Sequence, residues 1–242
     1  MRKFQDPDPD DTDWEFDDEE LPAAASADAM DLAATRDEAI CDVEVEVGRR
    51  LKRILADEQN VLLEATERSY AGPLVDVLPE LDKHVGMYLD AVVSQLENAI
   101  AAGAMFVEPA APSPKLLRNQ FEPAVRNLIV EPIRERLGEV VPNDDVDAAM
   151  NAVRGFYREH KRDNVAAAGV FMVLHAFARG TAGTVDQRVG VRWVFIEADR
   201  GCPDGHDNEL AGPLAVGEVF PSGAQMPPIA PGCRCLLVPA DR

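Results

Sequence analysis

The chain has 242 residues, 46% of them hydrophobic, and a formal net charge of −20 at pH 7. A chain of this length can bury a hydrophobic core without the help of a metal. The excess of acidic residues argues against direct sequence-specific nucleic-acid binding, which needs clustered Lys and Arg, and against binding to an anionic membrane. It favours contact with basic surfaces.

The first 20 residues form a strongly acidic segment. They carry ten Asp and Glu side chains against only Arg2 and Lys3. Self-repulsion and a low apolar content predict a largely disordered arm, which we extend over residues 1–38. No apolar run follows the two basic residues, so we expect no secretory signal and expect synthesis in the cytoplasm.

The middle of the chain, residues 39–182, has the spacing of a helical domain. Apolar side chains recur at steps of three and four, which is the pattern of helices with one buried face. We expect Gly72 to end the first helix, Gly103 to end the second, and Pro123 and Pro132 to kink or break the third. The helical patterns cover residues 43–65, 85–100, 117–137 and 146–157.

The fourth helix is expected to be the most apolar. Asn143 or Asp144 provides a cap at its start. The helix, or a broken pair, continues through the run 165–178 to about Arg179. This apolar run is too short to cross a bilayer, so no membrane span is expected.

The character of the sequence changes in the last 60 residues. Residues 191–197, VRWVFIE, have the clearest strand pattern in the chain. The sequence that follows is rich in Pro and Gly, with short apolar pieces at 219–220 and 236–238. The predicted fold is therefore mainly α, with a long helical body followed by a small β-containing C-terminal knuckle, residues 183–242. The knuckle has too few apolar side chains to fold unaided, and a metal or a covalent bridge would complete its core.

Two short clusters of metal-binding residue types lie in this knuckle. Cys202 and His206 are separated by three residues, and Cys233 and Cys235 by one. Soft sulfur and nitrogen donors suit tetrahedral Zn²⁺, so these four residues predict a structural Cys₃His zinc site. The alternatives are a disulfide from Cys202 to Cys233 or Cys235, and buried inert thiols. Cytoplasmic synthesis favours metal over a disulfide.

The other histidines and the remaining cysteine predict no site. His84 and His160 stand among charged residues and are expected to be solvated. His175 lies in the most apolar run and is expected to be a hydrogen-bonded core residue, and Cys41 a small buried hydrophobe. The sequence contains no GxSxG, HExxH, P-loop or GxGxxG motif, so the residues themselves indicate no enzyme.

The knuckle also carries a longer pattern. It resembles the C-terminal signature of phage minor head proteins, the Mu F-like head morphogenesis family, in which an Asp precedes CPxC, a Gly and an FP pair follow, and HPxCRC comes before an apolar stretch and a Pro. Gly205 stands in place of the second Cys of CPxC, with His206 beside it, and Ala230 stands in place of the His. The matching residues are Asp199, Cys202, Pro203, Gly217, Phe220, Pro221, Pro231, Cys233, Arg234, Cys235 and Pro239.

The resemblance implies a virion component. Such a protein associates with the portal protein, the major capsid protein or other copies of itself, and acts in head morphogenesis or DNA delivery. It would be found in the host cytoplasm during assembly and then in the head. The resemblance also leaves an alternative, a capsid maturation protease or another hydrolase, since relatives in actinobacterial phages are often labelled as such proteases. The sequence provides no recognisable set of nucleophile and base for that activity.

Overall fold

The structure is a computed structural model that describes residues 23–68, 70–142, 145–197 and 202–240. Residues 1–22 of the predicted arm lie outside this range. The long helices are α1 (Ala23–Glu67), α2 (Leu81–Val107), α5 (Val146–His160) and α6 (Ala166–Thr184), and the short ones are α3 (Glu122–Val125), α4 (Glu131–Gly138) and α7 (Gly205–Leu210). The strands are β1 (Gly190–Val194), β2 (Leu214–Ala215) and β3 (Leu236–Ala240). The mainly helical fold with a small C-terminal sheet is confirmed.

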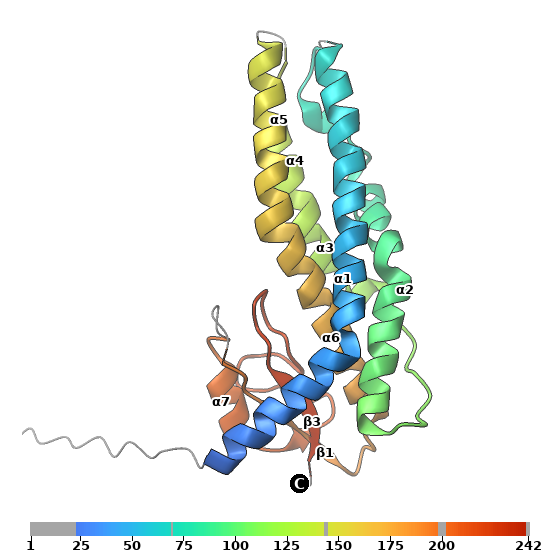
Figure 1. Cartoon of the computed structure of the whole chain (residues 1–242), viewed down its shortest axis with the longest axis vertical. Coiled ribbons are helices and arrows are strands. Elements are labelled where there is room, and N and C mark those ends of the chain that lie inside the picture. Colours follow the sequence, from blue (N-terminus) through green and yellow to red (C-terminus); the bar gives the residue numbers. More distant parts are fainter. Residues whose placement is uncertain (1–22, 69, 143–144, 198–201, 241–242) are drawn as a thin grey trace, which may run out of the picture.

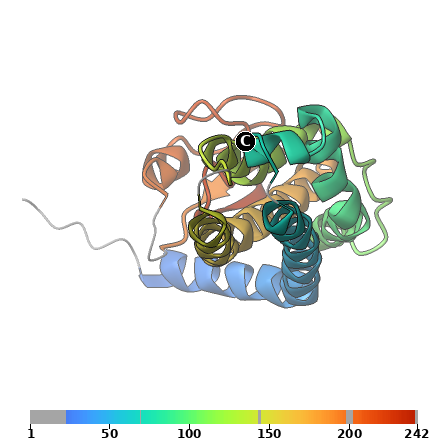
Figure 2. The same cartoon turned by 90° about the horizontal axis from the view of Figure 1, so that it is seen from above.

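The helical body is an elongated bundle, and the knuckle sits at one end of it (Figures 1 and 2). Its core is continuous from α1 to α6 and is formed by the apolar stripes that the spacing predicts. On α1, the stripe Val47, Leu51, Leu55 and Leu62 is almost completely buried.

The N-terminal half of α1 belongs to the fold rather than to the arm. Figure 1 shows this half running across the knuckle before the helix bends into the bundle. Ala33 packs there with Val194 of β1 and with Leu236 and Val238 of β3. The expected boundary between residues 38 and 39 therefore falls inside a helix. The Ala-rich stretch favours helix, and the sheet supplies the apolar surface that this stretch covers.

The third helical pattern begins just before Pro123 and is interrupted just before Pro132. Pro123 lies in the first turn of α3, where a missing N–H costs no helical hydrogen bond, and Pro132 lies in the first turn of α4. A π-helical turn, Arg126–Val130, joins the two helices. The expected capping residues Asn143 and Asp144 lie outside the described residues.

Asp145 caps α5, with its carboxylate accepting the Ala148 N–H at 2.9 Å. A second π-helical turn, Lys161–Val165, joins α5 to α6. Together these elements form one helical stretch of 39 residues, long and apolar enough by composition to cross a bilayer. However, 61% of the most apolar part of this stretch is buried inside the protein, as is typical of a core helix in a folded bundle.

Two glycines set the closest contact in the bundle, where α2 crosses α6. A Cβ on Gly103 would lie 2.0 Å from the Phe177 carbonyl oxygen, and one on Gly180 would lie 2.0 Å from the Ile100 carbonyl oxygen. The prediction that Gly103 ends the second helix is wrong, since α2 continues through it to Val107. The glycine is needed here because the backbones of the two helices touch, not because the chain turns.

We expect Gly180→Ala to lower the free energy of unfolding by about 3 kcal/mol, since the new methyl group must push two helix backbones apart. Gly86→Ala on α2 is the matched control, because a methyl group there would meet no atom of another element within 4 Å. It should be neutral or stabilise the protein by up to about 1 kcal/mol, because alanine favours helix. Urea unfolding followed by circular dichroism measures both, and equal stabilities would contradict the tight crossing.

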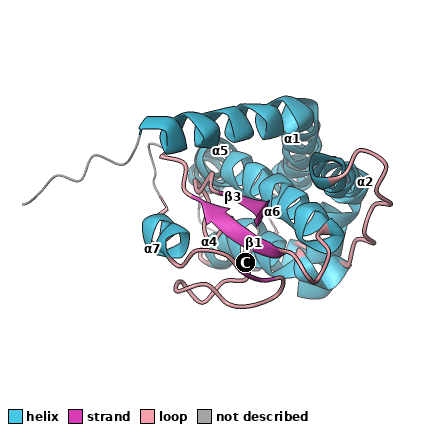
Figure 3. Ribbon diagram, turned by 90° about the horizontal axis from the view of Figure 1, so that it is seen from below, coloured by secondary structure: helices cyan, strands magenta, loops and turns pink. Residues whose placement is uncertain are grey.

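The knuckle contains a three-stranded antiparallel sheet in the order β2-β1-β3 (Figure 3). The predicted strand 191–197 is present as Gly190–Val194, and its partner β3 forms at the apolar piece 236–238. Trp193 lies opposite Leu237, and Val194 lies opposite Leu236. This register fixes the position of the residues that come just before β3.

Candidate metal centre

Three cysteines from two distant segments meet at the end of the sheet. Cys202 lies in the turn that begins α7, and the Gly205 N–H closes this turn by donating to the Cys202 carbonyl at 3.1 Å. Cys233 and Cys235 come just before β3. A turn in which the Cys233 N–H donates to the Ala230 carbonyl at 3.1 Å, with Gly232 at φ 97°, brings Cys233 into place. A φ of this size strongly favours glycine.

The three sulfur atoms lie within 4.8 Å of one another, and all three side chains are buried. No disulfide joins them. Three buried cysteines at this end of the sheet are therefore close enough to bind one metal ion. They are also part of the apolar core of the knuckle, together with Trp193 and Phe220.

The electrostatics of the three thiols depend on one another. Burial raises the pKa of Cys202 to about 11. A hydrogen bond from Cys235 lowers the pKa of Cys233 to about 6, and the same bond raises the pKa of Cys235. Without a metal ion, the three thiols therefore favour a state in which only one of them is deprotonated. A bound divalent cation would favour three thiolates, because its charge offsets theirs.

The surrounding groups fit such a cation. Backbone N–H groups of Asp204, Ile229 and Ile196 point to the sulfurs of Cys202, Cys233 and Cys235, where each favours the thiolate form. The indole Nε1 of Trp193 is also buried, has no conventional hydrogen-bond partner in the described chain, and faces Cys235. N–H groups that donate to sulfur in this way typically orient metal-bound thiolates.

The fourth predicted ligand, His206, is not part of the cluster. Its side chain is 51% exposed, and its Nδ1 lies 3.9 Å from Glu209 Oε2. The reason is the orientation of α7, which buries Gly205 and Asn208 and turns His206 outward. Gly205 packs closely against Cys202, since a Cβ there would meet Cys202 Cβ at 3.0 Å and the Phe195 ring at 2.5 Å. Among the described residues, the three cysteines have no fourth His, Cys, Asp or Glu ligand.

An arginine pair ties the cysteines to α1. Arg36 is 1% exposed, and its Nη1 donates to the Arg234 carbonyl at 2.6 Å and to the Cys235 carbonyl at 3.4 Å. Its Nε and the Nη2 of Arg234 both donate to Asp37 Oδ1 at 2.7 Å. The cysteine cluster and the N-terminal half of α1 are thus held as one unit. Sequence reasoning missed Arg36 and Asp37, because nothing distinguishes them from the exposed charges around them.

We expect Arg36→Met to lower the free energy of unfolding by about 2–3 kcal/mol, because it removes charged hydrogen bonds to two buried carbonyls. Arg49→Met is the control on the same helix, since Arg49 pairs with Glu46 at 2.8 Å but is 72% exposed. A surface pair of that kind contributes less than about 1 kcal/mol. If denaturant unfolding gives the two variants equal free energies of unfolding, the hydrogen bonds of Arg36 do not stabilise the packing of α1 on the knuckle.

Four other expectations from the sequence are corrected. His84 and His160 are buried rather than solvated, and Cys41 is exposed rather than buried. His84 bonds to a buried carboxylate on α1, and His160 Nε2 lies 3.1 Å from the Ile129 carbonyl. Cys41 follows the buried Ile40 on α1 and points to the opposite side. The buried Nδ1 of His175 has no hydrogen-bond partner in the described part of the chain, contrary to the expected bonded core histidine.

No family model, curated protein or solved structure gives a significant match to this chain. The interpretation of the metal centre rests on its own geometry and on the sequence pattern around the cysteines.

Proposed function

We propose that this protein is a phage minor head protein, or its descendant in a prophage, whose C-terminal knuckle is held by a structural zinc ion. The observation that supports it best is that the cysteines of the resembled signature, Cys202, Cys233 and Cys235, gather in one buried group. Arg234, from the same signature, anchors this group to α1. The residues that define the signature therefore have a shared structural role in this chain.

Zinc is the metal that the donor set favours. Three thiolates in a buried, apolar setting suit a soft, redox-inactive cation, and cytoplasmic synthesis keeps them reduced. With three protein ligands, zinc has one further position in its coordination shell. Burial of all three cysteines favours a structural role over a catalytic one, because substrate has little access to the ion.

The proposed partners are the portal protein and the major capsid protein, met first in the host cytoplasm and then in the assembled head. The strong negative charge favours basic partner surfaces and raises the rate of encounter with them. The elongated bundle provides a long solvent-facing surface for such contacts (Figure 1).

The test is to assemble particles from the phage or prophage genome that encodes this chain. Purified heads should contain the protein in a few copies, and electron microscopy should place it at the portal vertex or on the inner capsid surface. Removing its gene should give defective or empty heads. Normal, infectious heads that lack the protein would contradict the proposal. Specific cleavage of the capsid precursor by the purified protein would instead favour the protease alternative.

A further inference from the structure

A groove lies along the seam between the helical body and the knuckle. Two cavities of about 280 Å³ and 520 Å³ form it, and they share Phe171 and His175 of α6 and Ile229 of the loop before β3. Seams between structural units are common places for binding sites, and these volumes are in the range of known ones.

The wall of the groove is aromatic. The His175 ring stacks on Phe171 with centroids 6.2 Å apart and meets Phe121 edge-on at 5.7 Å. Burial lowers the pKa of His175 to about 4, so the ring is neutral at physiological pH. Its buried Nδ1 lacks a hydrogen-bond partner in the described chain, an unusual state for a native polar atom.

The groove has one charged lining residue among those described, Arg179, one helical turn after His175. Arg179 is partly buried, and burial lowers its pKa. It makes no ion pair or hydrogen bond to any described residue. Among the described residues it is a partly buried cation without an acidic partner, and burying a cation in that state costs free energy.

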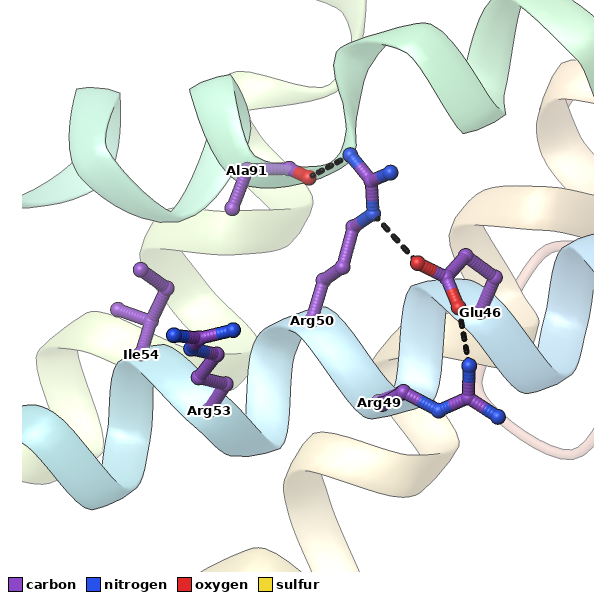
Figure 4. A pocket seen from close by; sticks show the side chains of 6 residues that line it. All are labelled: Glu46, Arg49, Arg50, Arg53, Ile54 and Ala91. Atoms are coloured by element: carbon purple, nitrogen blue, oxygen red, sulfur yellow. Dashed lines mark hydrogen bonds and ion pairs between the residues drawn. The ribbon is translucent and has the colours of Figure 1, made fainter.

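In a second surface cavity, of about 330 Å³, two of the three lining arginines pair within the protein (Figure 4). There Arg49 and Arg50 both pair with Glu46, at 2.8 and 2.9 Å, and Arg50 also donates to the Ala91 carbonyl at 3.2 Å. These arginines already have partners within the protein. Arg179 has no such partner in the part of the chain that the structure describes and can pair with a ligand.

We propose that this groove binds a peptide segment of a partner protein in which a carboxylate stands next to a large apolar side chain. The carboxylate pairs with Arg179, and the apolar side chain packs on Phe171 and His175. A single arginine cannot neutralise the many phosphate charges of a nucleic acid on so acidic a protein. It can neutralise the charge of one carboxylate. Two neutral polar side chains along the groove, Gln120 and Asn127, can bond to the peptide backbone.

The test uses the full-length protein and two short peptides of the same shape, acetyl-Phe-Asp-Ala-amide and acetyl-Phe-Asn-Ala-amide. Titrations followed by NMR of the histidine rings should show the His175 resonance moving with the Asp peptide. We expect the Asp peptide to bind about tenfold more tightly than the Asn peptide, as one charged hydrogen bond provides. Arg179→Gln should remove this preference, and Arg179→Lys should keep part of it.

Arg162→Gln is the control for net charge, because Arg162 is 71% exposed and pairs with Asp163. It should keep the full preference for the Asp peptide. Equal binding of the two peptides, a preference that survives in a folded Arg179→Gln variant, or no binding of either peptide at millimolar concentration would each overturn the proposal. This inference is independent of the role in head assembly, since no outcome of the titration depends on phage particles.

Discussion

Replacing Cys235 by serine is expected to remove zinc from the purified protein and to loosen the knuckle while the helical body stays folded. The three cysteines are core residues of the knuckle, and without a cation burial opposes the formation of a second thiolate. Structural zinc in small sites contributes on the order of 10 kcal/mol to folding, so the loss should exceed that of any ordinary core substitution. Elemental analysis gives the zinc content, and amide hydrogen exchange in β1 and β3 gives the local stability.

Cys41→Ser is the matched control, because it changes the same chemical group at an exposed position on α1. This variant should keep its zinc and its exchange protection. His206→Ala should also keep its zinc, since that side chain is turned away from the sulfurs. A wild-type protein with well under one zinc per chain, purified under reducing conditions without chelator, would leave a disulfide or a metal-free knuckle as the better account.

Glu58→Ala is expected to lower the free energy of unfolding by about 3–5 kcal/mol, the usual result of removing one partner of a buried charged network. Glu58 of α1 is 9% exposed and lies between two other helices. His84 Nε2 lies 2.5 Å from its Oε2, and the Tyr157 hydroxyl donates to its Oε1 at 2.5 Å. The Tyr88 hydroxyl donates to Oε2 at 3.5 Å. Alanine would leave all three side chains buried without this acceptor.

Two variants make this measurement specific. Glu64→Ala removes another glutamate of α1, one that is 58% exposed and pairs with Arg68, and should cost less than about 1 kcal/mol. Glu58→Gln keeps an acceptor without the charge and should lie between the two. If urea unfolding shows Glu58→Ala to be no less stable than Glu64→Ala, the hydrogen bonds to Glu58 do not contribute to the stability of the bundle.

Much of the architecture follows from the sequence alone. The three- and four-residue apolar steps define helices because each must bury one face. Pro123 and Pro132 mark where the third helix begins and where it is interrupted, because proline lacks an N–H. The β-branched and aromatic run 191–197 forms the central strand of the sheet. The close placement of Cys202, Cys233 and Cys235 also follows, because a knuckle with few apolar side chains needs a cross-link.

Only the tertiary structure decided which polar side chains are inside and what they meet. His84 is surrounded by charges in the sequence, yet it is buried, because Glu58 lies 26 residues earlier and reaches it from another helix. Arg36 is buried for a similar reason, since its partners are carbonyls 198 and 199 residues away.

The same distinction separates the three clustered cysteines from His206. His206 is only four residues after Cys202 in the sequence, but the first turn of α7 points its side chain into solvent. Local propensity and periodicity are carried by neighbouring residues and can be read from the sequence. The burial of a charge and the direction of a ligand depend on partners that only the folded chain brings together.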